Sequence, residues 1–207
     1  MELQVDAVSA VQSSSGVLCG SPRVELTLHA VAADLAESLI GLAVPRLQTA
    51  LLSGNKGGVV GSGRTCEITW FSHNENPAVQ TIVDTVAAVA GLPGRHAERL
   101  QVIRYSQGGE YRPHFDSYDL DSECGRRCTA SRGQRTHTAL LYLNEGFAGG
   151  ETVFPRLSLK VRPRQGAILT FENCVSGTTL RHEKSLHAGA PVLDGEKWAA
   201  TLWFRER

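Results

Sequence analysis

The sequence predicts an α+β fold that is mainly β: an antiparallel barrel or jelly roll with supporting helices from the N-terminal half packed on its outside. Two observations predict this class. From Leu100 onward, short β-type runs alternate with turns that contain glycine or proline, whereas the earlier segments include apolar residues at helical spacing. The runs are LQVIRYS, YRPHFDSY, THTALLYLN, ETVFP, LSLKV, GAILTFE, KSLHAGAPV and KWAATLWFRE.

Length and composition indicate a single domain, which we place at residues 23–207. A chain of 207 residues, 42% of them hydrophobic, can build one sizeable core but not two well-separated ones. The 21 basic and 21 acidic residues balance, so no basic excess indicates a nucleic-acid partner. No apolar stretch reaches the ~20 residues that cross a bilayer, and no signal peptide is evident. We therefore expect no membrane partner and take the cytoplasm as the default location; the oligomeric state is left open.

The first elements in order are an arm, a strand and a helix. Residues 1–22 are rich in serine and valine without sustained periodicity, and we expect them to be a loosely ordered N-terminal arm. Residues 24–28 alternate like a strand. Residues 32–44 place apolar side chains near helical spacing before Pro45, which predicts a helix that ends there.

Two further segments are expected to be loops. Residues 53–63 are so rich in glycine that either a lid or a plain connector is consistent with them. Residues 64–71 return to extended character, and Pro77 opens a helix that runs to about Ala90. The polar segment 117–135 has no apolar period and is long enough for an active-site loop, either closing over a substrate or simply solvated.

The five cysteines do not form a regular disulfide framework. They are odd in number, so at least one thiol is expected to be free unless chains pair. Cys124 and Cys128 have a C-x-x-x-C spacing that allows zinc binding or a small disulfide loop, but no second Cys/His pair lies nearby at zinc-finger spacing. The plainer interpretation is two loop cysteines.

His114 and Asp116 form half of a candidate metal site. They lie at positions i and i+2 of a strand-like run, so their side chains project to the same face while Phe115 projects to the other. Two histidines and one carboxylate on one face of an octahedral ion leave three positions open, which suits a non-haem Fe(II) centre. Because H-x-D alone is a weak motif, a second histidine is required.

His187 is the preferred third ligand. It alternates with Ser185 and Gly189 in one predicted strand, and Lys197 follows a turn at Asp194 and Gly195 into the next strand. The alternative, His182, has no comparable strand context. On the strand that begins at Lys197, alternate residues up to Trp203 are expected on one face, with Trp198, Leu202 and Phe204 packed behind.

These motifs carry a resemblance to a known family. Residues 101–205 resemble the prolyl 4-hydroxylase branch of the Fe(II)- and 2-oxoglutarate-dependent dioxygenases through QVIRY, YRPHFD, YLN followed by GGETVFP, GAILTF, LHAGAPV and GEKWAATLWF in the family's order. Each block alone is weak, but their combined order is specific. The resemblance implies a double-stranded β-helix, which is a jelly roll. The segment Gly149 to Thr152 is likewise a feature of that family, which we interpret as a tight turn that continues as a strand.

The resemblance also implies site residues. His114, Asp116 and His187 would bind iron, and Lys197 would pair with the 5-carboxylate of 2-oxoglutarate. Two hydroxyl residues, Tyr105 and Thr138, match positions that hydrogen-bond this cosubstrate. Two aromatic residues, Tyr111 and Trp203, match positions that line the substrate groove.

The implied activity is that of a procollagen-proline 4-dioxygenase-like prolyl 4-hydroxylase, which uses O2 and 2-oxoglutarate to hydroxylate proline-containing peptides or proteins and releases succinate and carbon dioxide. Because Asp116 would occupy the position that halogenating relatives leave for halide, hydroxylation is favoured. Ascorbate is implied by the family only. Two alternatives remain: a related dioxygenase that acts on another side chain or a free amino acid, and a non-catalytic jelly-roll binding module that retains metal.

Overall fold

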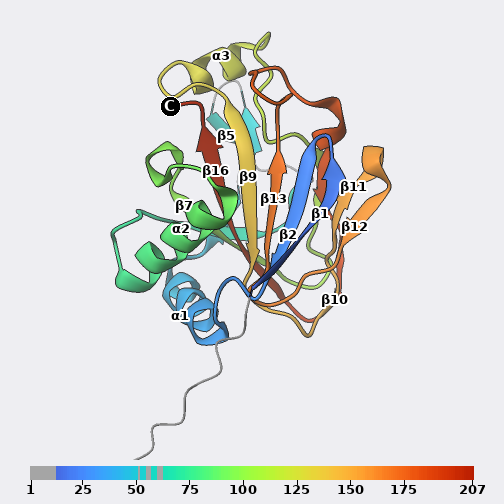
Figure 1. Ribbon diagram of the computed structural model, residues 1–207. Helices are drawn as coiled ribbons and strands as arrows, with labels where there is room; N and C mark the ends of the chain where they lie inside the picture. The colour runs from blue at the N-terminus through green and yellow to red at the C-terminus, as the bar shows by residue number, and fades with distance from the viewer. Residues whose placement is uncertain (1–12, 51, 55–56, 60–62) are drawn as a thin grey trace, which may run out of the picture.

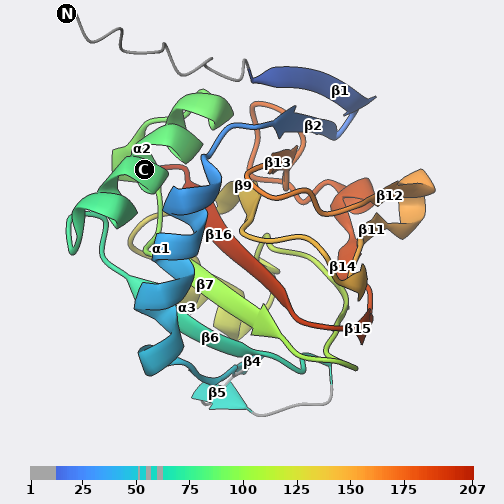
Figure 2. The ribbon, with the colours of Figure 1, turned by 90° about the horizontal axis from the view of Figure 1, so that it is seen from below.

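Two antiparallel sheets face each other, and helices cover the outer face of the larger one (Figures 1 and 2). The computed structural model describes residues 13–50, 52–54, 57–59 and 63–207. The mainly β class predicted from the sequence is confirmed, and the paired sheets form the jelly roll, or double-stranded β-helix. Among the described residues, no helix has the length and apolar character needed to cross a bilayer.

The large sheet has eight strands in the order β1-β2-β13-β9-β16-β7-β6-β3. Their bounds are β1 Ser14–Gly20, β2 Arg23–Leu28, β13 Ile168–Glu172, β9 Arg135–Tyr142, β16 Lys197–Arg205, β7 Leu100–Tyr105, β6 Glu67–Phe71 and β3 Gln48–Thr49. Strand β16 lies between β9 and β7, and all of its residues except Arg205 are buried, because both of its faces are covered.

The small sheet has four strands in the order β12-β11-β14-β8. Their bounds are β12 Leu159–Val161, β11 Thr152–Phe154, β14 His187–Gly189 and β8 Tyr111–His114. Two short pairs complete the strands: β10 Ala148–Gly149 with β15 Val192–Asp194, and β4 Leu52–Gly54 with β5 Gly57–Val59. Phe154 of the small sheet packs edge-on against Phe171 of the large sheet, with ring centroids 5.1 Å apart, so the space between the sheets is a second apolar core.

Helices α1 and α2 run along the outer face of the large sheet, opposite the side on which β11, β12 and β14 lie (Figure 2). The helices are α1 Ala33–Ala43, α2 Pro77–Ala90 and α3 Glu123–Thr129, and the short 3-10 turns are η1 Val44–Arg46, η2 Gly94–His96, η3 Pro155–Leu157 and η4 Glu183–Ser185. Leu39 of α1 and Ile82 of α2 are fully buried in one cluster with Leu202 of β16. The helices thereby occupy one face of β16 and leave its other face for the site.

The predicted limits of α2 match the structure because its sequence signals are strong. The side chain of Asn76 accepts a hydrogen bond from the backbone N–H of Ala78 at 2.8 Å, and Pro77 opens the first turn. Gly91 ends the helix in the left-handed conformation, with φ of 65°.

Three expectations differ from the structure. Ser14–Gly20 is strand β1, paired with β2, where the sequence predicts a loosely ordered arm; the rest of that arm, residues 1–12, lies outside the described residues. The polar segment 117–135 contains helix α3, which Ser122 caps through a hydrogen bond from the backbone N–H of Gly125. The glycine-rich segment 53–63 lies partly outside the described residues, and its described parts belong to the strand pair β4 and β5.

Candidate metal centre and adjoining pocket

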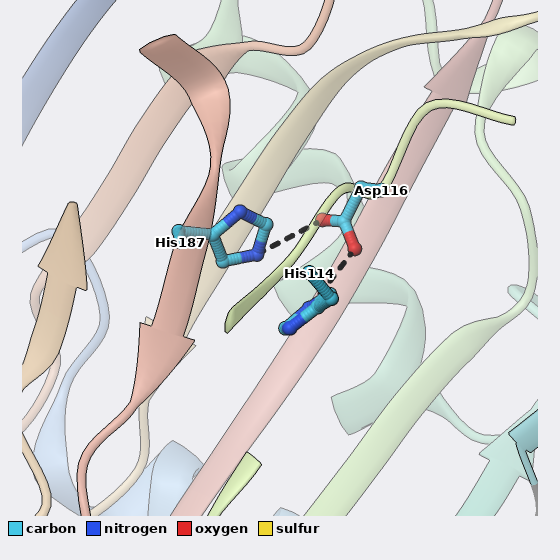
Figure 3. A group of neighbouring side chains, drawn as sticks. All are labelled: His114, Asp116 and His187. Atoms are coloured by element: carbon cyan, nitrogen blue, oxygen red, sulfur yellow. Dashed lines mark ion pairs between the residues drawn. The ribbon is translucent and has the colours of Figure 1, made fainter. Parts of the chain in front are cut away.

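Three side chains from separate parts of the chain meet between the two sheets. His114 ends β8 and His187 begins β14, and the two are direct partners in the antiparallel register of these strands. Asp116 follows β8 by two residues. The carboxylate of Asp116 lies 3.5 Å from Nε2 of His114 and 3.6 Å from Nε2 of His187, as the dashed lines in Figure 3 show. One ligand atom from each residue lies within 4.8 Å of the others, which is close enough to share one ion.

The hydrogen bonds of both imidazoles fix which nitrogen faces the carboxylate. Nδ1 of His114 lies 2.8 Å from the carbonyl oxygen of Arg112, and Nδ1 of His187 lies 2.9 Å from that of Ser185. A carbonyl only accepts, so each Nδ1 carries a proton and Nε2 of each ring faces Asp116, where the neutral form of the ring offers a lone pair. Three acceptors therefore face one another, an arrangement that a cation between them stabilises.

The directions in which the pKa values of His187 and Asp116 shift agree with a cation site. Burial, reinforced by His114 and only partly opposed by Asp116, lowers the pKa of His187 to about 4, so this imidazole is neutral at neutral pH. Burial alone would raise the pKa of Asp116, but His187 and His114 in their protonated forms, together with Arg135, outweigh it and hold that pKa below its usual range. An ionised carboxylate and a neutral imidazole are the forms that bind metal.

The local backbone differs in part from the expectation. Strand β8 ends at His114, so Asp116 lies just beyond the strand, although its side chain still turns to the same site. Ser185 lies in the turn η4 and not in a strand with His187. His182, the alternative ligand, caps η4: its Nδ1 accepts from the backbone N–H of Lys184 and its Nε2 lies 3.1 Å from the hydroxyl of Ser21, so it is not one of the three grouped residues.

Lys197 lines the same pocket as the three candidate metal ligands, His114, Asp116 and His187. It is only 3% exposed and is the direct cross-strand partner of Tyr105. Its ammonium group donates to the carbonyl oxygen of Gly150 at 2.7 Å, and no carboxylate of the described residues lies within ion-pairing distance. Burial lowers its pKa to about 8. A buried ammonium group without a counter-anion is costly, so this end of the pocket favours an anionic ligand.

The glycine pair at 149–150 does more than turn the chain. Gly150 has φ of 70°, a conformation that L side chains rarely adopt, and a Cβ there would lie 3.2 Å from the side chain of Lys197. The carbonyl that Gly150 offers to Lys197 was not predicted from the sequence. The sequence features that could have indicated this hydrogen bond are the glycine pair and a lysine expected to be buried.

The hydroxyl residues predicted at the pocket take different partners. Tyr105 lines the pocket, and burial raises the pKa of its phenol, so this group is a neutral hydrogen-bond donor. Thr138 of β9 also lines the pocket, but its hydroxyl donates to Asp116 at 2.7 Å. Its single proton is therefore already engaged.

A groove with a volume of about 980 Å³ opens beside the three candidate metal ligands. Asp116, Tyr111 and Trp203 line both the groove and the inner pocket, so the two are continuous at the cluster. The ring of Tyr111 stacks on that of His114, with centroids 3.5 Å apart. Trp203 is 7% exposed, and its indole N–H has no hydrogen-bond partner among the described residues.

Two arginines of the groove were missed by the sequence analysis. Arg135 holds its guanidinium 4.0 Å from the ring centroid of Trp203 and donates twice to Glu98, at 2.6 and 2.8 Å. Arg64 lies over the ring of Tyr111 at 4.7 Å. Neither arginine stands in a pattern that distinguishes it from a solvated residue, so only the structure identifies them.

Cys124 and Cys128 lie one turn apart on α3, with sulfur atoms 4.0 Å from each other. No disulfide joins them, and Cys19, Cys66 and Cys174 form none either. Cys124 and Cys128 therefore do not form the small disulfide loop that the spacing allows.

Comparison with known proteins places the chain among oxygenases. The family model described as the 2OG-Fe(II) oxygenase superfamily matches residues 100–205. A putative prolyl 4-hydroxylase of Acanthamoeba polyphaga mimivirus is 41% identical over 145 residues, which cover 70% of this chain and 59% of that protein. The human prolyl 4-hydroxylase subunit alpha-1 is 33% identical over 189 residues, 90% of this chain and 35% of that subunit. The chain thus spans less than two thirds of the length of these relatives.

A solved structure has a similar fold. The viral collagen prolyl hydroxylase of Paramecium Bursaria Chlorella virus-1, determined as a 2OG complex, superposes with a TM-score of 0.70 at 28% identity. The match covers 91% of this chain and 98% of that one.

We expect His187→Ala to weaken Mn²⁺ binding by more than the roughly 10- to 100-fold that loss of an outer-shell partner costs, because one of three protein ligands is removed. Isothermal titration calorimetry without oxygen measures this. His182→Ala is the matched control and should leave the dissociation constant unchanged. Equal binding by wild type and His187→Ala would disprove the site.

Proposed function

The chain belongs to the 2OG-Fe(II) oxygenase superfamily, and on that premise we propose that it is an Fe(II)- and 2-oxoglutarate-dependent dioxygenase that hydroxylates prolyl residues of peptides or proteins at the 4-position. The observation that carries this proposal is the cluster of three facing acceptors next to a buried lysine without a carboxylate partner. The names of the relatives support the prolyl substrate.

The donor set fits iron. His114, Asp116 and His187 would hold Fe(II) through two imidazole nitrogens and one carboxylate oxygen, a combination that suits non-haem iron and leaves positions open for other ligands. The carbonyl oxygens of Arg112 and Ser185 keep both imidazoles in the required tautomer. Bound together, Fe(II) and 2-oxoglutarate supply the activation of O2 that leads to hydroxylation of a substrate carbon, with succinate and carbon dioxide released.

The inner pocket fits the cosubstrate. Lys197 would donate a charge-assisted hydrogen bond to the far carboxylate of 2-oxoglutarate, and the phenol of Tyr105, across the strand pair, is placed to donate a second. The wall between Lys197 and the cluster is apolar, with Leu140, Ala199 and Phe171 among the lining residues. This wall excludes water from the reacting centre and strengthens the electrostatic interactions within it.

The groove fits an extended peptide. Trp203 lines the groove beside the three candidate metal ligands, and Arg135 packs against its ring. Together with Tyr111, it would form one wall for a prolyl ring. Proline-rich peptides are already extended in solution, so an aromatic groove binds them at a low ordering cost.

The test starts with the protein loaded anaerobically with Fe(II) and 2-oxoglutarate, then given oxygen and a proline-rich peptide. We expect one added oxygen on proline by mass spectrometry and an equal amount of succinate. The control is the same peptide with the target proline replaced by alanine. Turnover only with other side chains or free amino acids would overturn the prolyl assignment, and metal binding without consumption of 2-oxoglutarate would indicate a non-catalytic module.

We expect Lys197→Met to weaken 2-oxoglutarate binding by about 10- to 150-fold, since a hydrogen bond to a charged group contributes about 1.5–3 kcal/mol. Anaerobic titration of the Mn²⁺-loaded protein measures the dissociation constant. Mn²⁺ affinity should be retained, because Lys197 does not contact the cluster. An unchanged affinity for 2-oxoglutarate would exclude Lys197 as its anchor.

We also expect the affinity for 2-oxoglutarate to be constant below pH 8 and to fall as the pH rises above it. Burial lowers the pKa of Lys197 to about 8 in the free protein, and a bound carboxylate stabilises the protonated form, so binding above that pH requires uptake of a proton. Titrations between about pH 6.5 and 9.5 measure the slope. Lys197→Met should show no such fall; a fall of the same size in that variant would refute the assignment.

A further inference from the structure

A chain of two buried hydrogen bonds leads away from the candidate metal centre. The hydroxyl of Thr138 lies 2.7 Å from Oδ2 of Asp116, and Nδ2 of Asn173 lies 2.8 Å from the same hydroxyl oxygen. Thr138 is 2% exposed and Asn173 is fully buried. Thr138 lies in β9 of the large sheet, and Asn173 directly follows β13 of the same sheet.

The direction of these hydrogen bonds is determined by chemistry. The ionised carboxylate of Asp116 can only accept, so Thr138 must donate its one proton to it. The threonine oxygen then has only lone pairs for Asn173, which must present its amide N–H₂ group. A rotated amide would place two acceptors against each other. Asn173 therefore fixes the direction of the hydroxyl of Thr138.

The backbone of Asn173 also reaches the second side of the centre. Its carbonyl oxygen accepts from the hydroxyl of Ser185 at 3.3 Å and from the backbone N–H of His182 at 2.9 Å. Ser185 in turn offers its carbonyl oxygen to Nδ1 of His187 at 2.9 Å. Asn173 thus takes part in the hydrogen bonding that supports two of the three candidate ligands, Asp116 and His187.

Asn173 is a poor choice for stability alone. Its Oδ1 is buried and has no hydrogen-bond partner among the described residues, which costs free energy. An apolar side chain of similar volume would avoid this cost. The polar side chain is explained by what it does for Thr138.

We propose that Thr138 is a positioning residue for the metal ligand Asp116, held in its donating orientation by Asn173, and that it is not a cosubstrate-binding residue. This inference rests on the proposed function, in which Asp116 binds iron. It replaces the role in 2-oxoglutarate binding that the family resemblance implies for Thr138. Outer-shell partners of this kind orient the ligand and tune the affinity for metal.

The experiment separates the two roles by measuring two dissociation constants, for Mn²⁺ alone and for 2-oxoglutarate at saturating Mn²⁺, by calorimetry without oxygen. For Thr138→Val, which keeps the shape and removes the hydroxyl, we expect Mn²⁺ binding to weaken about 10- to 100-fold while 2-oxoglutarate binding changes less. Thr138→Ser, which restores a hydroxyl, should recover most of the Mn²⁺ affinity.

Asn173→Leu tests the second bond of the chain. It should weaken Mn²⁺ binding in the same direction as Thr138→Val. Because Asn173 acts through the hydroxyl, the double variant should bind Mn²⁺ no more weakly than Thr138→Val alone. Asn76→Ala, which removes the helix cap of α2 far from the site, is the control for lost stability and should leave both constants unchanged.

Each outcome has one meaning. If Thr138→Val weakens 2-oxoglutarate binding more than Mn²⁺ binding, or changes neither constant, the positioning role is wrong. Additive losses of Mn²⁺ affinity in the double variant would show that Asn173 does not act through the hydroxyl of Thr138. Failure of the wild-type protein to bind Mn²⁺ would instead overturn the proposed function itself.

Discussion

The candidate site is organised around three groups that face one another: the carboxylate of Asp116 and Nε2 of His114 and of His187. The carboxylate of Asp116 lies against Nε2 of two imidazoles whose Nδ1 protons are used elsewhere, so a cation between them would stabilise the site. Lys197 repeats the problem with the opposite sign, because its buried ammonium group donates to the carbonyl of Gly150 and has no carboxylate within ion-pairing distance among the described residues. The pocket therefore has one place that favours a cation, between the three candidate ligands, and another that favours an anion, at Lys197. A metal ion together with an anionic ligand would satisfy both.

The strand register explains how distant residues meet. His114 and His187 are direct partners in the small sheet, as are Lys197 and Tyr105, and Thr138 and Trp203, in the large sheet. Each pair brings one candidate site residue against another without a loop to position it. The helices on the outer face of the large sheet pack against β16 from behind.

Much of this fold could be predicted because its local patterns agree with its tertiary structure. The apolar alternation of β16 correctly separated Trp198, Leu202 and Phe204, which pack under the helices, from the face that lines the pocket. Helix α3 was missed, since it has no apolar stripe to indicate it. Strand β1 was missed because its pairing with β2 outweighs a weak local preference. Asn173 and Arg135 were missed because their roles depend on partners distant along the chain.

The position of β16 in the sheet has a consequence for synthesis. This strand lies between β9 and β7, yet it follows every other described strand along the chain. A nascent polypeptide that has emerged only as far as β15 has a large sheet split at its middle, with β9 and β7 exposing unpaired edges. Closure joins segments far apart in sequence, so it is slow, and chaperone protection during that interval is more important for this topology than for a helical bundle of equal length.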